Sequence, residues 1–159
     1  MLLILKGKRK ASGKNVNFAV SEFLMLNPLI RNTFRKAEKI CNQKQIETLF
    51  ASGKSCTYGQ FRLIYLETEP TGTPPVQVLI AVPKKNLRNA VARNRMKRLM
   101  REAYRILKHK ITGVLSNAGK HYDIAFIFTG NQCVSQTETL TAIKALLDRL
   151  LKIHEKNSE

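Results

Sequence analysis

The sequence predicts a single small α+β domain. Three observations support this: the length and apolar content of the chain, neighbouring β-rich runs, and helical segments around them. A chain of 159 residues with 43% hydrophobic composition can bury one core and is too short for two ordinary domains. The segments follow the order α, β, β, α, β, α. This order predicts helices packed against one sheet.

A short first helix is expected over about Gln43 to Ser52. Asn42 is a good N-cap for it, and Gly53 ends the helical pattern. The apolar residues of this segment recur at helical spacing: Ile46, Leu49 and Phe50.

The sheet is expected from the runs Tyr58 to Thr68, Val76 to Val82 and Tyr122 to Thr129. The first two carry apolar residues on both faces, so we expect one face of the sheet to be covered and the other partly covered. Two longer helices complete the domain, about Ala90 to Lys110 and about Gln136 to His154. The buried stripe of the last helix is expected to be Leu140, Ile143, Leu147 and Leu150 or Leu151.

The residues up to about Arg31 mix basic side chains with Ser, Asn and Gly and show no sustained period, which is typical of a disordered arm. A second methionine leaves another interpretation open. In that interpretation Met25 is the natural start and the preceding residues are an artefact.

The charge of the chain indicates a polyanionic partner. Lys and Arg number 28 against 11 Asp and Glu, giving a net charge of +17. A membrane surface is not expected, because no free-standing segment offers a bulky apolar face opposite a basic one. The apolar start Met1 to Leu5 precedes its basic residues, the reverse of a secretory signal, and no run approaches a membrane span. We therefore expect a cytoplasmic protein.

The cysteines do not predict a zinc site or a disulfide framework. Cys41, Cys56 and Cys133 are widely spaced, form no C-x-x-C pair, and lie at no ligand spacing from a histidine. We expect reduced cysteines at core or surface positions, and no metal-ligating residue is predicted.

The stretch from Pro83 to Lys110 is the most informative, because its basic residues greatly outnumber its lone acid, Glu102. An apolar stripe suited to docking on a sheet consists of Met96, Leu99, Met100, Ala103, Ile106 and Leu107. Basic residues step by four along another side, flanked by two further arginines: Arg93, Lys97, Arg101 and Arg105, with Arg95 and Arg98. Like charges at this spacing repel by about 0.2–0.5 kcal/mol per pair, and RNA phosphates would compensate for the repulsion. A solvated basic surface is the competing interpretation, and the almost unrelieved charge argues against it.

Asn94 lies near the start of this helix although asparagine is a poor helix former. A capping role and an RNA contact both explain it, and its position alone does not separate them.

The residues of this stretch resemble a known signature. Lys84, Lys85, the Asn89-Ala90-Val91 step and the run from Arg93 to Ala103 are similar to the signature helix of the bacterial ribonuclease P protein family, whose hallmark is Arg-Asn-Arg followed by Lys-Arg and Arg. Weaker similarity extends from about Phe34 to the last helix, including Ile46, Phe50, Gly53, Ser55, Phe61 and Leu63. The resemblance divides the chain into residues 1–33, an arm or artefactual extension, a domain over 34–155, and a tail over 156–159.

The resemblance implies a fold and an RNA-binding surface. The fold is a sandwich of a four-stranded mixed sheet and three helices in the order α-β-β-β-α-β-α, with a left-handed βαβ crossover, as in the second domain of a small-subunit ribosomal protein. Residue by residue, the implied binding set for the catalytic RNA subunit is Lys84, Lys85, Arg88, Asn89, Arg93, Asn94, Arg95, Lys97, Arg98, Arg101 and Arg105.

The resemblance also implies a cleft for the single-stranded 5′ leader of precursor tRNA. Its expected walls are Ile46, Phe50, Phe61 and Ile64. Anchoring of the first helix to the core is the alternative role for Ile46 and Phe50. The family often has aromatic residues where this chain has Ile46 and Ile64, and often a Gly before the Asn89-Ala90-Val91 step, where this chain has Asn86-Leu87-Arg88. Stacking in the cleft and the loop path are the features that these departures affect.

The expected function is that of the protein subunit of ribonuclease P, with the RNA subunit and precursor tRNA as partners and no small-molecule substrate. The family resemblance implies that the RNA subunit holds the catalytic Mg²⁺. A self-sufficient nuclease would need clustered carboxylates, yet Asp123 and Asp148 are the only aspartates and the glutamates are dispersed. Two rival functions remain: a non-catalytic structural RNA-binding protein such as a ribosomal component, and a helix protein that reads the DNA major groove.

Overall fold

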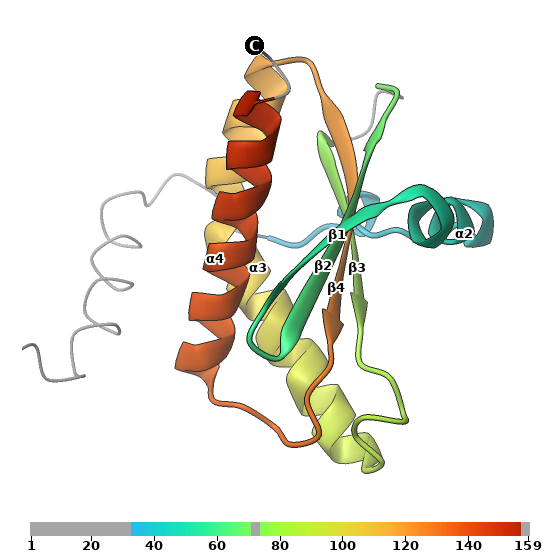
Figure 1. Cartoon of the computed structure of the whole chain (residues 1–159), viewed down its shortest axis with the longest axis vertical. Coiled ribbons are helices and arrows are strands. Elements are labelled where there is room, and N and C mark those ends of the chain that lie inside the picture. The colour runs from blue at the N-terminus through green and yellow to red at the C-terminus, as the bar shows by residue number, and fades with distance from the viewer. Residues whose placement is uncertain (1–32, 71–73, 157–159) are drawn as a thin grey trace, which may run out of the picture. The chain divides into compact units, whose positions relative to one another are not determined.

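A computed structural model describes residues 33–70 and 74–156. The predicted arm therefore lies almost wholly outside the described residues. The observed order confirms the predicted α-β-β-β-α-β-α arrangement (Figure 1). In chain order the elements are η1 (Lys36–Glu38), α2 (Gln43–Ser52), β1 (Lys54–Tyr58), β2 (Phe61–Thr68), β3 (Val76–Ala81), α3 (Ala90–Asn117), β4 (His121–Phe128) and α4 (Gln136–Lys156).

The four strands form one mixed sheet in the order β1-β2-β4-β3. β1 pairs antiparallel with β2 and β2 antiparallel with β4, whereas β3 runs parallel to β4. The parallel pair requires a long crossover, and α3 supplies it. The left-handedness of this β3-α3-β4 crossover stays a prediction.

One strand and one helix end differ from what the residue pattern alone predicted. β1 was not expected, because its sequence KSCTY has no apolar alternation and the strand lies at the sheet edge with mostly exposed residues. Gly59, at φ 55°, makes the turn between β1 and β2. α3 is longer than predicted: it continues past Lys110 to Asn117, because Ile111 and Leu115 extend its buried stripe.

The helices lie in layers on the two faces of the sheet. α3 and α4 cover one face and the short α2 crosses the other (Figure 1). The larger core fills the α3/α4 side and includes the predicted residues Met96, Met100, Ala103, Ile143 and Leu147. As expected, one face is covered and the other is covered only in part.

α2 is held on its face by a smaller core and by close backbone packing. Leu49 is fully buried against Ile64, Ala125 and Ile40. A Cβ added at Gly53 would lie 2.6 Å from Ile64 Cγ2, so only glycine allows the end of α2 to approach β2 this closely. Asn42 caps the helix as predicted, its side chain accepting a hydrogen bond from Lys44 N at 3.0 Å.

Candidate RNA interface

Asn89 defines where α3 begins. Its side-chain oxygen accepts a hydrogen bond from Val91 N at 2.8 Å, so Asn89 is the N-cap of the helix. Asn94 lies inside the first turns, exposed, and is not the cap. The capping role considered for Asn94 is therefore wrong, and its amide faces solvent.

Arg93 holds the loop that precedes α3. Its Nη1 donates hydrogen bonds to the carbonyl oxygens of Leu87, at 2.9 Å, and Arg88, at 2.7 Å. Two further contacts anchor the same loop: Asn86 Nδ2 donates to Phe128 O at 3.0 Å, and Leu87 is buried in the main core. The loop that departs from the family pattern is therefore tied to the sheet, and Arg93 positions it.

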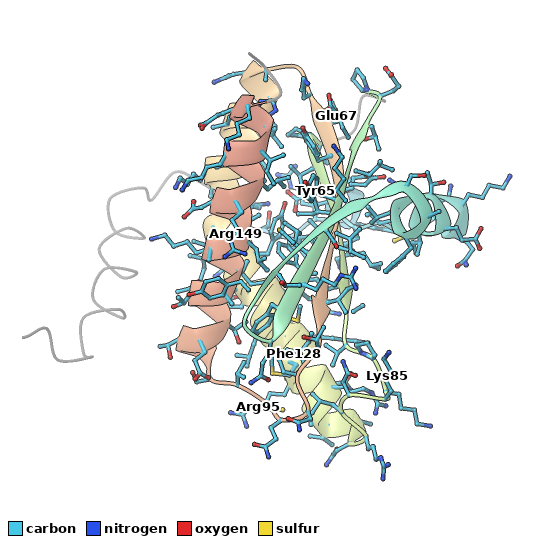
Figure 2. All side chains as sticks on the ribbon, in the orientation of Figure 1. Tyr65, Glu67, Lys85, Arg95, Phe128 and Arg149 are labelled. Carbon is cyan, nitrogen blue, oxygen red and sulfur yellow. The ribbon has the colours of Figure 1, made fainter. Side chains whose placement is uncertain are left out.

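The exposed cations of this region gather around the start of α3. Figure 2 shows Lys85 of the loop and Arg95 of the helix at the same end of the molecule. The basic surface consists of Lys84, Lys85, Arg88, Arg95, Lys97, Arg98 and Arg101, of which only Lys97 is half-buried. Within residues 33–70 and 74–156 none of these seven side chains forms an ion pair. Their charges are thus uncompensated inside the described part of the protein.

Arg105 differs from the other residues of the predicted basic row. Its guanidinium forms two hydrogen bonds with the Glu102 carboxylate, Nε to Oε2 at 2.9 Å and Nη2 to Oε1 at 2.5 Å. The hydrogen bond from Arg105 lowers the pKa of Glu102, and the same bond raises the pKa of Arg105. Arg105 is thus the member of the predicted RNA-binding row that is paired with a carboxylate of its own helix, and its contact with RNA stays a prediction.

The four predicted leader-cleft residues do not lie together. Phe50 is 46% exposed on α2, Ile46 is half-buried, and Ile64 lies buried beneath the helix. Phe61 is only 3% exposed and packs edge-on against Phe128, at 5.2 Å between ring centroids, in the core on the opposite face. Phe61 therefore cannot line a cleft on the α2 face, because strand alternation points it the other way.

Two residues that the sequence analysis missed belong to the α2 face. Arg62 of β2 pairs in register with Ile127 of β4, and both alternate with the main-core residues of their strands. Arg62 is exposed and its Nη2 donates to Ser55 Oγ at 3.1 Å, while Ile127 is half-buried beside the smaller core. An apolar side chain next to a cation on an uncovered sheet face is suited to an unstacked base and its phosphate.

Residues 33–70 and 74–156 carry neither a cluster of metal ligands nor a membrane-spanning helix. In that part of the chain no three His, Cys, Asp or Glu side chains come together as a possible metal site. None of its helices combines the length and the apolar character that crossing a membrane requires.

Comparisons with known proteins agree on one family. The family model described as Ribonuclease P matches residues 34–151. The ribonuclease P protein component of Chlorobium phaeobacteroides is 42% identical over 109 residues, covering 64% of this chain and 75% of the relative. That of Chlorobaculum tepidum is 33% identical over 133 residues, covering 80% and 86%.

Solved structures show the same fold. The RNase P protein of Staphylococcus aureus matches with a TM-score of 0.55 at 22% identity, over 72% of this chain and 96% of that chain. The RNase P protein from Thermotoga maritima matches with a TM-score of 0.53 at 23% identity, over 70% and 96%. The fold, the signature helix and the family match lead to one conclusion: the chain belongs to the ribonuclease P protein family and is a protein subunit of this ribonucleoprotein endonuclease.

Proposed function

We propose that the basic surface at the start of α3 binds the RNA subunit of ribonuclease P, and that the flank of α2 carrying Phe50 holds the single-stranded 5′ leader of precursor tRNA. The main observation in support of RNA-subunit binding is the cluster of cations without an ion-pair partner. Seven basic side chains of the loop before α3 and of the first half of α3 have no carboxylate partner among the described residues.

A folded RNA supplies what this surface lacks. Each phosphate that replaces condensed counterions with a lysine or arginine releases those counterions, so binding is favourable and weakens steeply with salt. Arginine can hold two phosphate oxygens at once, and Arg95, Arg98 and Arg101 are all exposed. Lys84 and Lys85 extend the surface along the loop that Arg93 holds in place.

The leader proposal starts from the exposed aromatic ring of Phe50. An aromatic side chain left 46% exposed loses part of the stability that burial would give, and a stacked base would cover it. The partner surface on the sheet is Ile127, with Arg62 beside it. Because Ile64 is buried under α2 rather than open to solvent, the proposed walls are Phe50, Ile46 and Ile127.

The protein's contribution is binding and positioning. We propose that the RNA subunit holds the Mg²⁺ ions, which would supply activation of the attacking water. Cations of the basic surface lower the repulsion between the two RNA molecules, and the leader contact fixes the register of the cleavage site relative to the RNA. The site of action proposed is the cytoplasm, where precursor tRNA is made in bacteria.

A reconstitution assay tests the proposed function. The full chain is mixed with the RNA subunit and Mg²⁺ at low salt, and cleavage of precursor tRNA is measured with each component omitted in turn. We expect the complete mixture to produce mature 5′ ends and the protein alone to cleave nothing. Cleavage by the protein alone would reject the mechanism, and failure of the protein to stimulate the RNA subunit would favour a structural RNA-binding role instead.

A further inference from the structure

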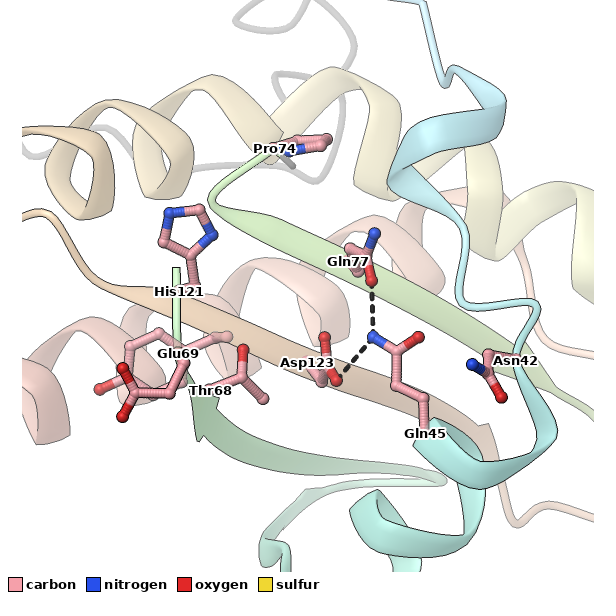
Figure 3. A pocket seen from close by; sticks show the side chains of 9 residues that line it. Asn42, Gln45, Thr68, Glu69, Pro74, Gln77, His121 and Asp123 are labelled. Atoms are coloured by element: carbon pink, nitrogen blue, oxygen red, sulfur yellow. Dashed lines mark hydrogen bonds between the residues drawn. The ribbon is translucent and has the colours of Figure 1, made fainter. Parts of the chain in front are cut away.

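A polar hollow lies beside the N-terminal end of α2, on a different flank of the helix from Phe50. It encloses about 400 Å³ and is lined by Asn42, Gln45, Thr68, Glu69, Pro74, Gln77, His121, Tyr122 and Asp123 (Figure 3). Gln45 and Phe50 are five residues apart on a helix of 3.6 residues per turn, which places them on different flanks of α2. The hollow is thus separate from the proposed leader walls but lies on the same face of the sheet.

The floor of the hollow is a carboxylate that the fold only half satisfies. Asp123 is 4% exposed, and Gln45 Nε2 donates to its Oδ2 at 2.8 Å. The same Gln45 nitrogen donates to Gln77 Oε1 at 2.6 Å, which fixes both amides (Figure 3). No described residue donates a hydrogen bond to Asp123 Oδ1. Beside it, His121 Nδ1 is buried without a hydrogen-bond partner.

The groups that remain free in the hollow are mostly acceptors. Gln45 donates both of its hydrogen bonds through Nε2. Its Oε1 therefore remains available as an acceptor, together with Asp123 Oδ1. Glu69 adds a second carboxylate, and the described lining contains no Lys or Arg. A phosphate is excluded by these charges. The ligand that fits must present hydrogen-bond donors to these oxygens.

A neutral donor fits this chain better than a cation does. The net charge of +17 repels cations from the whole molecule, and the described residues form no cluster of three metal-ligating side chains. A neutral base is not repelled by this charge. The volume is within the range of about 300–1,000 Å³ found for small-ligand sites. The imidazole ring of His121 and the pyrrolidine ring of Pro74 line the hollow, and a base can lie against them (Figure 3).

We propose that this polar hollow binds the guanine base of a single-stranded RNA nucleotide, with Asp123 Oδ1 accepting from one of the two donors N1–H and N2–H of its Watson–Crick edge and Oδ2 accepting from the other through the lone pair that Gln45 leaves free. Guanine is the base that presents two adjacent donors on this edge, which match a carboxylate. Adenine and cytosine present one amino group, and uracil one ring N–H. This inference rests on the proposed function, since it requires an unpaired RNA strand on the α2 face.

The direct test uses the full chain and short single-stranded oligoribonucleotides that differ at one central position. The oligoribonucleotides carry guanine, inosine, adenine or uracil in a uridine background, and side-chain amide signals of Gln45 and Gln77 are followed by NMR. We expect guanine to bind about tenfold more tightly than the others. Inosine lacks the N2 amino group, so it should lose most of this preference. Equal affinity of the wild-type protein for the guanine and inosine oligoribonucleotides would overturn the proposal.

Protein variants supply the second arm. Asp123→Asn keeps the shape of the side chain but replaces an acceptor with a donor, and should abolish the guanine preference. Asp148→Asn on α4 removes the same charge from another face and should retain it. If Asp123→Asn instead changes only the response to Mg²⁺ titration, with all bases equal, the hollow is a cation site and the proposal is wrong.

The holoenzyme identifies the source of the base and separates this proposal from the function on which it rests. Precursor tRNAs carry one guanine moved stepwise along an otherwise uridine leader. A guanine preference at one step that Asp123→Asn removes assigns the base to the leader. Weaker binding of the RNA subunit by Asp123→Asn, without a leader preference, assigns it to the RNA subunit. The proposal is overturned if a leader raises the affinity for precursor tRNA wherever its guanine stands and Asp123→Asn binds the RNA subunit as wild type does. That result leaves the proposed function intact. A leader that has no effect overturns the leader part of the proposed function.

Discussion

Lys108 Nζ, in the middle of α3, lies 2.5 Å from Glu38 Oε1 of η1 and also donates to Thr33 O at 2.5 Å. Both side chains are enclosed, at 7% and 13% exposure. The residue after η1, Lys39, bridges to Val78 of β3, and α2 begins four residues later. This pair therefore ties the segment that leads into α2 to the helix that carries the basic surface.

Removing one partner of this enclosed ion pair should destabilise the fold strongly. We expect Lys108→Ala to lower the free energy of unfolding by about 3–5 kcal/mol, because it leaves the Glu38 carboxylate without its counter-charge. Urea unfolding of the full chain measures this. The double variant Lys108→Met with Glu38→Leu should recover most of the loss, because both charges are then absent. Unfolding of Lys108→Ala at the wild-type urea midpoint would show that the pair contributes nothing.

Arg93 should behave as a structural residue of the interface. We expect Arg93→Ala to lower stability by about 1.5–3 kcal/mol, because two loop carbonyls lose a charged donor, and to weaken RNA-subunit binding as the loop loosens. Arg93→Lys should not fully restore either property, since its ammonium nitrogen lies one bond nearer the backbone than Nη1, the single nitrogen that reaches both oxygens. Urea unfolding and RNA-subunit affinity, measured on the same samples, check both effects. A variant with weakened RNA binding at unchanged stability would instead mark Arg93 as a direct phosphate contact.

Asp123 should reduce stability at neutral pH. Burial raises the pKa of this carboxyl above its usual 3.8, against the hydrogen bond from Gln45, which lowers it. The folded state thus binds the proton more tightly than the unfolded state, and stability falls as pH rises from 3.8 through the raised pKa. Asp123→Asn has no charge to desolvate, so it should be more stable than wild type above this window and lose the advantage below it.

Urea unfolding of wild type and Asp123→Asn across this pH window checks the prediction, with Asp148→Asn on α4 as a control. A difference between wild type and Asp123→Asn that does not vary with pH would contradict it. Retention of a destabilising carboxylate is consistent with the binding role proposed for it, since functional groups often cost stability.

Phe50 should act on the leader and not on the fold. Because its ring is 46% exposed, Phe50→Ala should change stability little, yet it should weaken binding of leader-bearing precursor tRNA by about 1–3 kcal/mol, the range for one stacked base. Binding of tRNA without a leader should stay at the wild-type value. Val114→Ala, an equally simple loss of an exposed apolar side chain on α3, is the matched control. A large loss of stability in Phe50→Ala would support the alternative role as a core anchor.

The sequence was sufficient for the elements that bury an apolar stripe and for the location of the basic surface. It was not sufficient for β1, whose edge position leaves it without an apolar pattern. The end of α3 was set too early although Ile111 and Leu115 continue the stripe, since Thr112 and Gly113 interrupt the helix-forming residues there.

Two features of the candidate site had a signal in the sequence that the expected residue sets did not use. Phe61 and Ile64 are three residues apart on a strand, so they cannot face the same cleft, and alternation alone excludes one of them. Glu102 and Arg105 are three apart on a helix, the spacing at which opposite charges pair. By contrast, Lys108 meets Glu38 across 70 residues and Asp123 meets Gln45 across 78. Such contacts follow from the tertiary fold and have no local signature.

The salt dependence of RNA-subunit affinity tests directly whether the basic surface binds RNA. Wild type should show a steep linear fall of log affinity with log salt, and Arg95→Ala with Arg98→Ala should reduce the slope by about one per lost phosphate contact. Arg105→Ala, which removes a cation already paired with Glu102, should reduce the slope less. The charge-matched control is the double variant Lys152→Ala with Lys156→Ala, at the C-terminal end of α4. It should leave the slope unchanged. Equal slopes for wild type and the Arg95 and Arg98 variant would contradict the assignment of the basic surface to RNA.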